Sequence, residues 1–198
     1  MRIAIIGAGY VGLTSAAVYA KLGHTVYAVR KDADKVEMLK RWEVPFYEPG
    51  LSELVKEGVK SGRLIPTTSY AEAVPSSEVV FICVGTPPLP SGEADLSQVF
   101  AAAKEIAENW GPSPSPLPKG EGVRRTGEGY KVIVNKSTVP VGTAGKVRKV
   151  IEEALTPPLT PPLGGGKKSV SSPLQGEVRR GLDFDVASCP EFLREGSA

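Results

Sequence analysis

The stretch "IIGAGYVGLTSAAVYAKLGH" (residues 5–24) decides the fold class of this 198-residue chain. Gly7, Gly9 and Gly12 form a Gly-x-Gly-x-x-Gly pattern between a short apolar run and a helical pattern. In such a turn the first glycine permits the tight bend, the second lets the backbone approach a pyrophosphate, and the third lets the helix pack on the strand. Free amides at the helix N-terminus then face the phosphates. The stretch therefore predicts a dinucleotide-binding strand, turn and helix.

The same alternation of strand and helix continues along the chain. Short β-branched runs predict strands at residues 2–6, 25–29, 63–68, 78–84, within 130–138 and at 184–188. Amphipathic patterns predict helices at residues 11–22, 33–40, 51–60, 96–110 and 144–155. Asp95 is the expected N-cap of the fourth of these helices. The alternation favours an α/β, Rossmann-type fold with a doubly wound parallel sheet, for which we expect strand order 3-2-1-4-5-6.

Two Pro-rich segments, 112–129 and 156–182, interrupt the alternation and contain nine of the 18 prolines. Such a composition cannot build a packed core, so we expect two disordered loop insertions within one domain spanning 1–198. The segments share Ser-Pro-Leu, Gly-Glu and Val-Arg-Arg in the same order, which indicates two copies of one inserted element. A polyproline ligand for a partner domain is the alternative.

Composition excludes several classes of protein. No apolar run approaches the roughly 20 residues of a membrane span, so a soluble protein is expected. The Pro-rich segments hold seven Lys/Arg and three Glu, which gives them a net charge of +4. Because the whole chain has a net charge of +2, the remaining residues carry about −2. That balance does not favour a nucleic-acid surface. Two cysteines and no export signal indicate neither disulfides nor a metal site, and favour the cytoplasm.

Arg30 stands where the second strand ends, about 20 residues after the glycines, where an acid usually meets the ribose 2′-hydroxyl. One interpretation is that Arg30 and Lys31 accommodate a 2′-phosphate, which predicts NADP. The other is a solvated charge, with Asp32 or another group meeting the ribose. The only histidine, His24, is expected in a turn and not in catalysis.

Polar turns follow three of the later strands, at 84–88, 135–143 and 188–198. Because the carboxyl ends of parallel strands meet at one edge of the sheet, these turns predict a ligand site there, with Gly85 and Thr86 against the cofactor. Taken alone, Ser137 and Thr138 are more typical of a helix cap. Glu191 and Glu195 alone suggest a solvated helix face.

Five motifs together carry a family resemblance. They are "GAGYVG" (7–12), "PFYEPGL" (45–51), "VGTPPLPSGEADLSQV" (84–99), "KSTVPVGT" (136–143) and "PEFLREGSA" (190–198). In combination they resemble the UDP-glucose 6-dehydrogenases of the UDP-glucose/GDP-mannose dehydrogenase family, over nearly everything outside the Pro-rich segments. The resemblance implies NAD-dependent, two-step oxidation of the C6 alcohol of a UDP-sugar to the acid, through an aldehyde and a thioester on a catalytic cysteine. A place in polysaccharide biosynthesis follows.

Residue roles follow from the matching motifs. Thr138 is implied to position the reacting water and the cofactor, and Glu191 to act as the general base of thioester hydrolysis. Glu195 is implied to approach the nicotinamide. The substrate-contacting run is Glu191, Phe192, Leu193, Arg194 and Glu195. Together with the residues argued above, the predicted cofactor-binding set is Gly7, Gly9, Tyr10, Val11, Gly12, Arg30, Lys35, Gly85, Thr86, Ser137, Thr138 and Glu195.

The chain departs from the family pattern in several places. Arg30 replaces the family's acid, Trp42 lies in the stretch where a glycine is usual, and Cys189 stands in place of an asparagine. Neither Cys83 nor Cys189 shows the partner that a nucleophilic thiol needs. The family's nucleophilic cysteine, central helix and C-terminal substrate domain are expected beyond Ala198.

We therefore expect dinucleotide binding by these residues without completed oxidation of UDP-glucose. Two alternatives stay open. One is another Rossmann dehydrogenase. The other is a non-catalytic truncated or split-gene remnant, with a separately encoded C-terminal half as its candidate partner.

Overall fold

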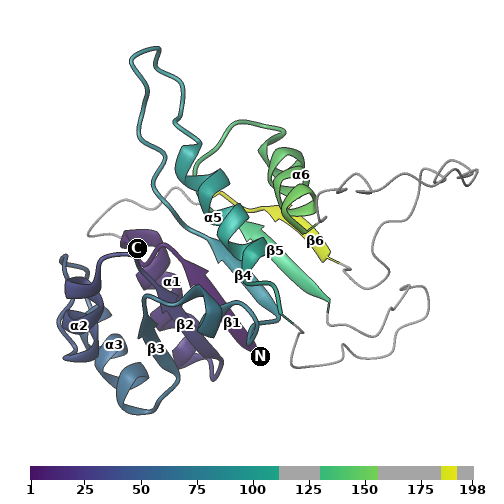
Figure 1. Ribbon diagram of the computed structural model, residues 1–198. Coiled ribbons are helices and arrows are strands. Elements are labelled where there is room, and N and C mark those ends of the chain that lie inside the picture. The colour runs from purple at the N-terminus through teal and green to yellow at the C-terminus, as the bar shows by residue number, and fades with distance from the viewer. Residues whose placement is uncertain (112–129, 156–183, 191–198) are drawn as a thin grey trace, which may run out of the picture.

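The computed structural model describes residues 1–111, 130–155 and 184–190. The two Pro-rich segments and the predicted substrate-contacting run 191–195 lie outside these residues, so the expectations for them stay predictions. Within the described residues the strands form one six-stranded sheet of order β3-β2-β1-β4-β5-β6, in which every pair is parallel. The predicted fold class and strand order are confirmed (Figure 1).

The strands and helices lie close to where the sequence places them. The strands are β1 (Arg2–Ile6), β2 (Thr25–Val29), β3 (Leu64–Thr67), β4 (Val79–Ile82), β5 (Lys131–Asn135) and β6 (Phe184–Ser188). The helices are α1 (Tyr10–Lys21), α2 (Ala33–Lys40), α3 (Leu51–Lys60), α4 (Tyr70–Ala73), α5 (Ser97–Glu108) and α6 (Thr143–Leu155). The single-turn helix α4 was not expected, because four residues are too few to show a helical period.

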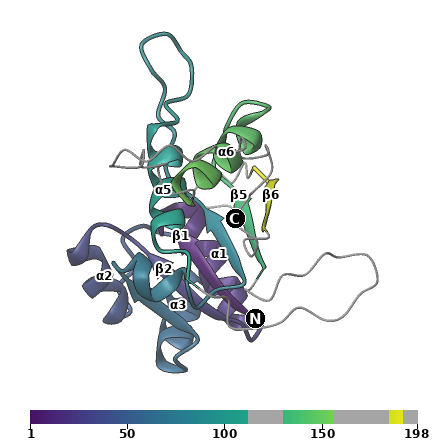
Figure 2. The same cartoon turned by 45° about the vertical axis from the view of Figure 1, so that its right-hand side comes forward.

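Two apolar layers separate the helices from the sheet. Alternate residues of β1 point to opposite faces, so Ile3 and Ile5 pack with α1, α2 and α3, whereas Ala4 and Ile6 pack with α4, α5 and α6. Figure 2 shows α5 and α6 lying together, away from α2 and α3. Burial on both faces explains why the four residues of β1 that follow Arg2 are all apolar.

The start of α5 corrects the expected N-cap. The N-cap residue is Leu96, which makes no side-chain cap hydrogen bond. Asp95 lies one residue earlier and its carboxylate accepts a 2.8 Å hydrogen bond from the amide of Ser97. The expected residue therefore satisfies a free amide of the first turn from outside the helix, because the chain becomes helical one residue later than its pattern suggested.

Candidate functional site

The glycine turn joins β1 to α1 under tight steric limits. Gly7 has a φ of 99°, and a Cβ at this position would lie 2.6 Å from the carbonyl oxygen of Cys83. A Cβ on Gly12 would overlap the carbonyl oxygen of Gly7. By contrast, a Cβ on Gly9 would meet nothing within 4 Å. Gly7 and Gly12 are therefore required by the packing of the chain itself, whereas Gly9 leaves open space.

Gly9 is also the N-cap of α1 and supplies no side-chain acceptor to the helix. Its missing side chain exposes the amides of the first turn of α1, which carry the partial positive charge of the helix N-terminus. An open approach to free amides suits a phosphate group. The turn thus has the shape and charge that a pyrophosphate needs.

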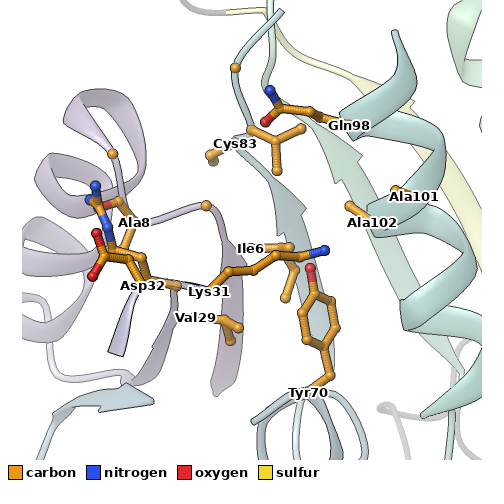
Figure 3. Close-up of a pocket in the computed structure, with 15 residues that line it drawn as sticks. Ile6, Ala8, Val29, Lys31, Asp32, Tyr70, Cys83, Gln98, Ala101 and Ala102 are labelled. Atoms are coloured by element: carbon orange, nitrogen blue, oxygen red, sulfur yellow. The ribbon is translucent and has the colours of Figure 1, made fainter. Parts of the chain in front are cut away.

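A pocket of about 400 Å³ lies against this turn. Its walls come from the glycine turn, the end of β2, α4, the end of β4 and α5 (Figure 3). The lining residues are Ile6, Gly7, Ala8, Gly9, Val29, Arg30, Lys31, Asp32, Tyr70, Cys83, Val84, Gly85, Gln98, Ala101 and Ala102. It therefore lies at the carboxyl edge where β1 separates the two halves of the sheet, the usual crevice of a doubly wound fold.

Three charged side chains follow β2 at one end of this pocket. The Arg30 guanidinium donates a 2.6 Å hydrogen bond to the carbonyl of Ala8, inside the glycine turn. The Lys31 ammonium lies 2.7 Å from a carboxylate oxygen of Glu105 in α5. Both basic groups that the sequence offers to a 2′-phosphate therefore already have partners within the protein.

Asp32 caps α2. Its carboxylate accepts a hydrogen bond from the amide of Lys35 and lies 3.3 Å from the Lys35 ammonium. The hydrogen bond from the Lys35 amide, with help from the nearby charges, holds the pKa of Asp32 below its ordinary value. Asp32 lines the pocket and is ionised at neutral pH, so it remains a candidate partner of a ribose hydroxyl. Lys35 does not line the pocket.

The turns after β4 and β5 are linked to each other. The Thr86 hydroxyl donates to the carbonyl of Thr138 at 2.9 Å, and the Ser137 hydroxyl donates to the carbonyl of Val84 at 2.7 Å. Gly85, between these contacts, lines the pocket, whereas Thr86, Ser137 and Thr138 do not. The predicted residues are therefore close together, but the hydroxyl groups of Thr86 and Ser137 hold the two turns to each other.

Tyr10 and Val11 lie in the first turn of α1 and do not line the pocket. The Tyr10 hydroxyl donates to the buried carboxylate of Glu48 at 2.7 Å, and its ring packs edge-on against Phe46 at 5.3 Å. The "PFYEPGL" segment thus supports the start of α1. Tyr10 is placed here to support the turn through this contact, and its predicted role in binding cofactor stays a prediction.

Cys83 forms part of the pocket wall next to the glycine turn. Burial raises the pKa of its thiol to about 12, although the Lys136 charge opposes the shift. The thiol is therefore protonated at neutral pH, as expected for a structural cysteine and not for a nucleophile. Cys189 is exposed. His24 lies between α1 and β2, with its ring 6.4 Å from that of Tyr19 and away from the pocket.

Sequence reasoning missed the far wall of the pocket. Tyr70 comes from the unexpected helix α4, and Gln98, Ala101 and Ala102 come from α5. The run of small residues "AAA" at 101–103 was a possible signal, because small side chains on a helix facing a crevice leave room for a ligand. Nothing in the local sequence connects these residues to a turn more than 60 positions earlier.

Among the described residues, no group of three or more His, Cys, Asp or Glu side chains is suited to hold a metal ion. Within the same part of the chain, no helix is both long and apolar enough to cross a membrane.

Comparison with known proteins shows what the chain resembles. Residues 1–113 and 120–198 match the model described as "UDP-glucose/GDP-mannose dehydrogenase family, NAD binding domain". The chain is 43% identical to a UDP-glucose 6-dehydrogenase of Rhizobium meliloti (strain 1021) over 199 residues, covering 100% of this chain and 36% of the relative. It is 41% identical to UDP-glucose 6-dehydrogenase TuaD of Bacillus subtilis (strain 168), covering 100% of this chain and 34% of the relative.

Solved structures of dehydrogenases match the chain in fold as well as in sequence. A UDP-glucose dehydrogenase from the archaeon Pyrobaculum islandicum matches with a TM-score of 0.75 and 34% identity, covering 100% of this chain and 37% of that one. A ternary complex of GDP-mannose dehydrogenase from Pseudomonas aeruginosa matches with a TM-score of 0.73 and 34% identity, covering 98% of this chain and 37% of that one. The chain thus spans about a third of the length of the relatives it matches.

Proposed function

Because the chain belongs to the UDP-glucose/GDP-mannose dehydrogenase family and matches its NAD-binding domain, we propose that it binds NAD in the pocket beside the glycine turn. The proposal extends to its role as the cofactor-binding part of an enzyme that oxidises UDP-glucose to UDP-glucuronate. NAD, when bound, accepts the hydride that leaves the sugar. We place this activity in the cytoplasm.

The single observation that carries the proposal is the open space at Gly9. A Cβ on Gly7 or Gly12, the other two glycines of the turn, would collide with the backbone, yet a Cβ on Gly9 would meet nothing within 4 Å. The gap lies at the N-cap of α1 and lines a pocket of about 400 Å³. Among the described glycines with such open space, Gly9 is the one that lies both at a helix N-cap and in the wall of this pocket, which supports a ligand at the helix amides.

The chain's own residues then divide the work of binding. The α1 amides hold the pyrophosphate, the apolar side chains of Val29 and Ala102 flank the adenosine end, and Asp32 accepts a hydrogen bond from the ribose. Burial in this crevice excludes water from the cofactor. Thr138 and Glu191 keep their proposed parts, positioning the reacting water and removing its proton.

NAD is the proposed cofactor, and NADP is the alternative that Arg30 and Lys31 raise. Arg30 donates one hydrogen bond to the carbonyl of Ala8. A guanidinium has five N–H donors, so the others can still bind a phosphate. Its position therefore does not decide between the two cofactors by itself.

The test is a fluorescence or calorimetric titration of the 198-residue chain with NADH and with NADPH. Equal or stronger binding of NADH counts against recognition of a 2′-phosphate. If Arg30 does recognise a 2′-phosphate, an Arg30→Asp variant should shift preference toward NADH. Binding of neither dinucleotide contradicts the proposed function and favours a non-catalytic remnant.

A second measurement addresses the reaction. The relatives reported above are almost three times as long as this chain. We expect these 198 residues to bind the cofactor without completing the oxidation of UDP-glucose. Steady formation of UDP-glucuronate by the 198-residue chain alone would contradict this expectation. Appearance of activity only on adding a separately produced C-terminal half would support it.

A further inference from the structure

An ion pair crosses one end of the pocket. Lys31 follows β2, Glu105 lies 74 residues later in α5, and the ammonium and carboxylate are 2.7 Å apart. Lys31 lines the pocket on one side, and Ala101 and Ala102, one turn before Glu105, line it on the other. Figure 3 shows the Lys31 side chain running from the β2 side of the pocket toward α5 and Tyr70. The pair thus joins the two walls.

This end of the pocket receives the adenosine. The residues directly after β2 are those that meet the ribose 2′-hydroxyl in a doubly wound fold, and that ribose carries the adenine. NADP differs from NAD only by a phosphate on this hydroxyl, and a phosphomonoester adds a charge of roughly −1.5 to −2 at neutral pH. The charges nearest that phosphate therefore decide between the cofactors.

We propose that Glu105 is a specificity-determining residue that biases this pocket toward NAD. The proposal rests on the dinucleotide site proposed above. Glu105 acts in two ways: its carboxylate engages the Lys31 ammonium, and its own charge repels a 2′-phosphate. A 2′-phosphate must therefore compete with Glu105 for Lys31, whereas the 2′-hydroxyl of NAD does not.

The other groups at this end do not cancel the effect of Glu105. Asp32 adds a second negative charge on the same wall as Lys31. Arg30 donates to the carbonyl of Ala8 and keeps its charge, so its attraction for a phosphate is the same in the wild type and in a Glu105 variant. Tyr70 is buried, and burial together with the charge of Glu105 raises its pKa, so it remains neutral. Lys31 is therefore the cation whose availability Glu105 controls.

The chain offers a matched control on the same helix. Glu108 lies almost one turn after Glu105 and pairs with Lys104 at 3.8 Å, outside the pocket. Glu105→Gln and Glu108→Gln each remove one negative charge from α5, and only the first lies at the adenosine end. The side chains of Lys31 and Glu105 are 72% and 35% exposed, so breaking this pair should leave the fold intact.

The experiment measures the dissociation constants of NADH and NADPH for the 198-residue chain and both variants at one low ionic strength. We expect Glu105→Gln to improve binding of NADPH relative to NADH about fivefold, as suits a charge interaction near the surface. Glu108→Gln should leave the ratio within about twofold of the wild type. Lys31→Met should weaken NADPH and reduce the effect of adding Glu105→Gln. Thermal melting checks that each variant is folded.

The outcomes separate the two proposals. If the wild-type chain binds NADH but Glu105→Gln leaves the NADPH to NADH ratio unchanged, the role of Glu105 is refuted and the dinucleotide site stands. An equal change in Glu108→Gln also refutes it, since the effect would then be one of net charge. If neither dinucleotide binds to the wild type, the proposed function fails and the role of Glu105 fails with it.

Discussion

Replacement of Gly9 by alanine should separate cofactor binding from folding. The Gly9 backbone has φ −81° and ψ −157°, an extended conformation that alanine adopts without strain, and the new methyl group would meet nothing within 4 Å. The methyl group would instead occupy the approach to the first amides of α1. The variant should therefore fold at least as stably as the wild type while its affinity for the dinucleotide falls.

The expected magnitudes follow from this geometry. A compatible Gly→Ala change stabilises a protein by about 0.4–1 kcal/mol, because the unfolded chain loses freedom. Displacing the pyrophosphate by a methyl group costs at least one charge-assisted hydrogen bond, about 1.5–3 kcal/mol. That loss corresponds to roughly a tenfold to 150-fold weaker affinity. The two effects have opposite signs, so one protein sample tests both.

The assay combines urea denaturation with NADH titration of the same preparations. Gly145→Ala is the control, because a Cβ on Gly145 in α6 also meets nothing within 4 Å and lies away from the pocket. It should keep wild-type affinity. Gly12→Ala should instead lower the free energy of unfolding, because its methyl group overlaps the Gly7 carbonyl. Wild-type affinity in Gly9→Ala, or its unfolding, would refute the assignment of Gly9 to the ligand.

Other predictions concern the rest of the chain. Lys131 is fully buried, and its ammonium donates to the carbonyls of Val74 and Ser77, so Lys131→Met should lower the free energy of unfolding at pH 7 by about 1–3 kcal/mol. Burial lowers the pKa of Lys131 to about 8, from 10.5 in the unfolded chain. Between pH 8 and 10.5 the unfolded state therefore binds more protons than the folded state, so the free energy of unfolding of the wild type should rise with pH relative to that of Lys131→Met. Urea titrations at several pH values measure this, and a difference between the two proteins that does not change with pH would contradict it. At pH 8 a maleimide or disulfide reagent should label Cys189 quickly and Cys83 only after unfolding. Rapid labelling of both cysteines in the native protein would be inconsistent with a pKa of about 12 for Cys83. Trp42 has a φ of 68°, and its ring centroid lies 4.5 Å from the Lys60 ammonium. Trp42→Gly should change the free energy of unfolding by less than about 1 kcal/mol, because relief of backbone strain offsets the lost cation–π contact. A loss above about 2 kcal/mol would show that strain is absent.

Much of the fold was predictable because its signals are local. The runs "RIAII" and "TVYAV" are short, apolar and β-branched, which is typical of strands covered on both faces, and both became central strands. The glycine spacing placed the turn. The alternation predicted a parallel sheet, and the Gly-x-Gly-x-x-Gly turn favoured the strand order that is typical of dinucleotide-binding folds.

The site was predictable only in part. Gly7, Gly9, Arg30 and Gly85 line the pocket as expected, since each directly follows a strand at the same sheet edge. The opposite wall could not be predicted, because α4 is too short to show a helical pattern and the sequence does not say which face of α5 lies toward the pocket. The predictions for 191–195 concern residues that the structure does not describe.

The sequence by itself determined the class of fold, the edge of the sheet at which the pocket lies and the glycine turn beside that pocket. These features depend on residues within a few positions of one another. Only the tertiary structure decided the partners of the charged groups: Arg30 with the carbonyl of Ala8, and Lys31 with Glu105. The members of these pairs are 22 and 74 residues apart, and hydrophobic periodicity reports which face of an element is buried but not which distant side chain meets it.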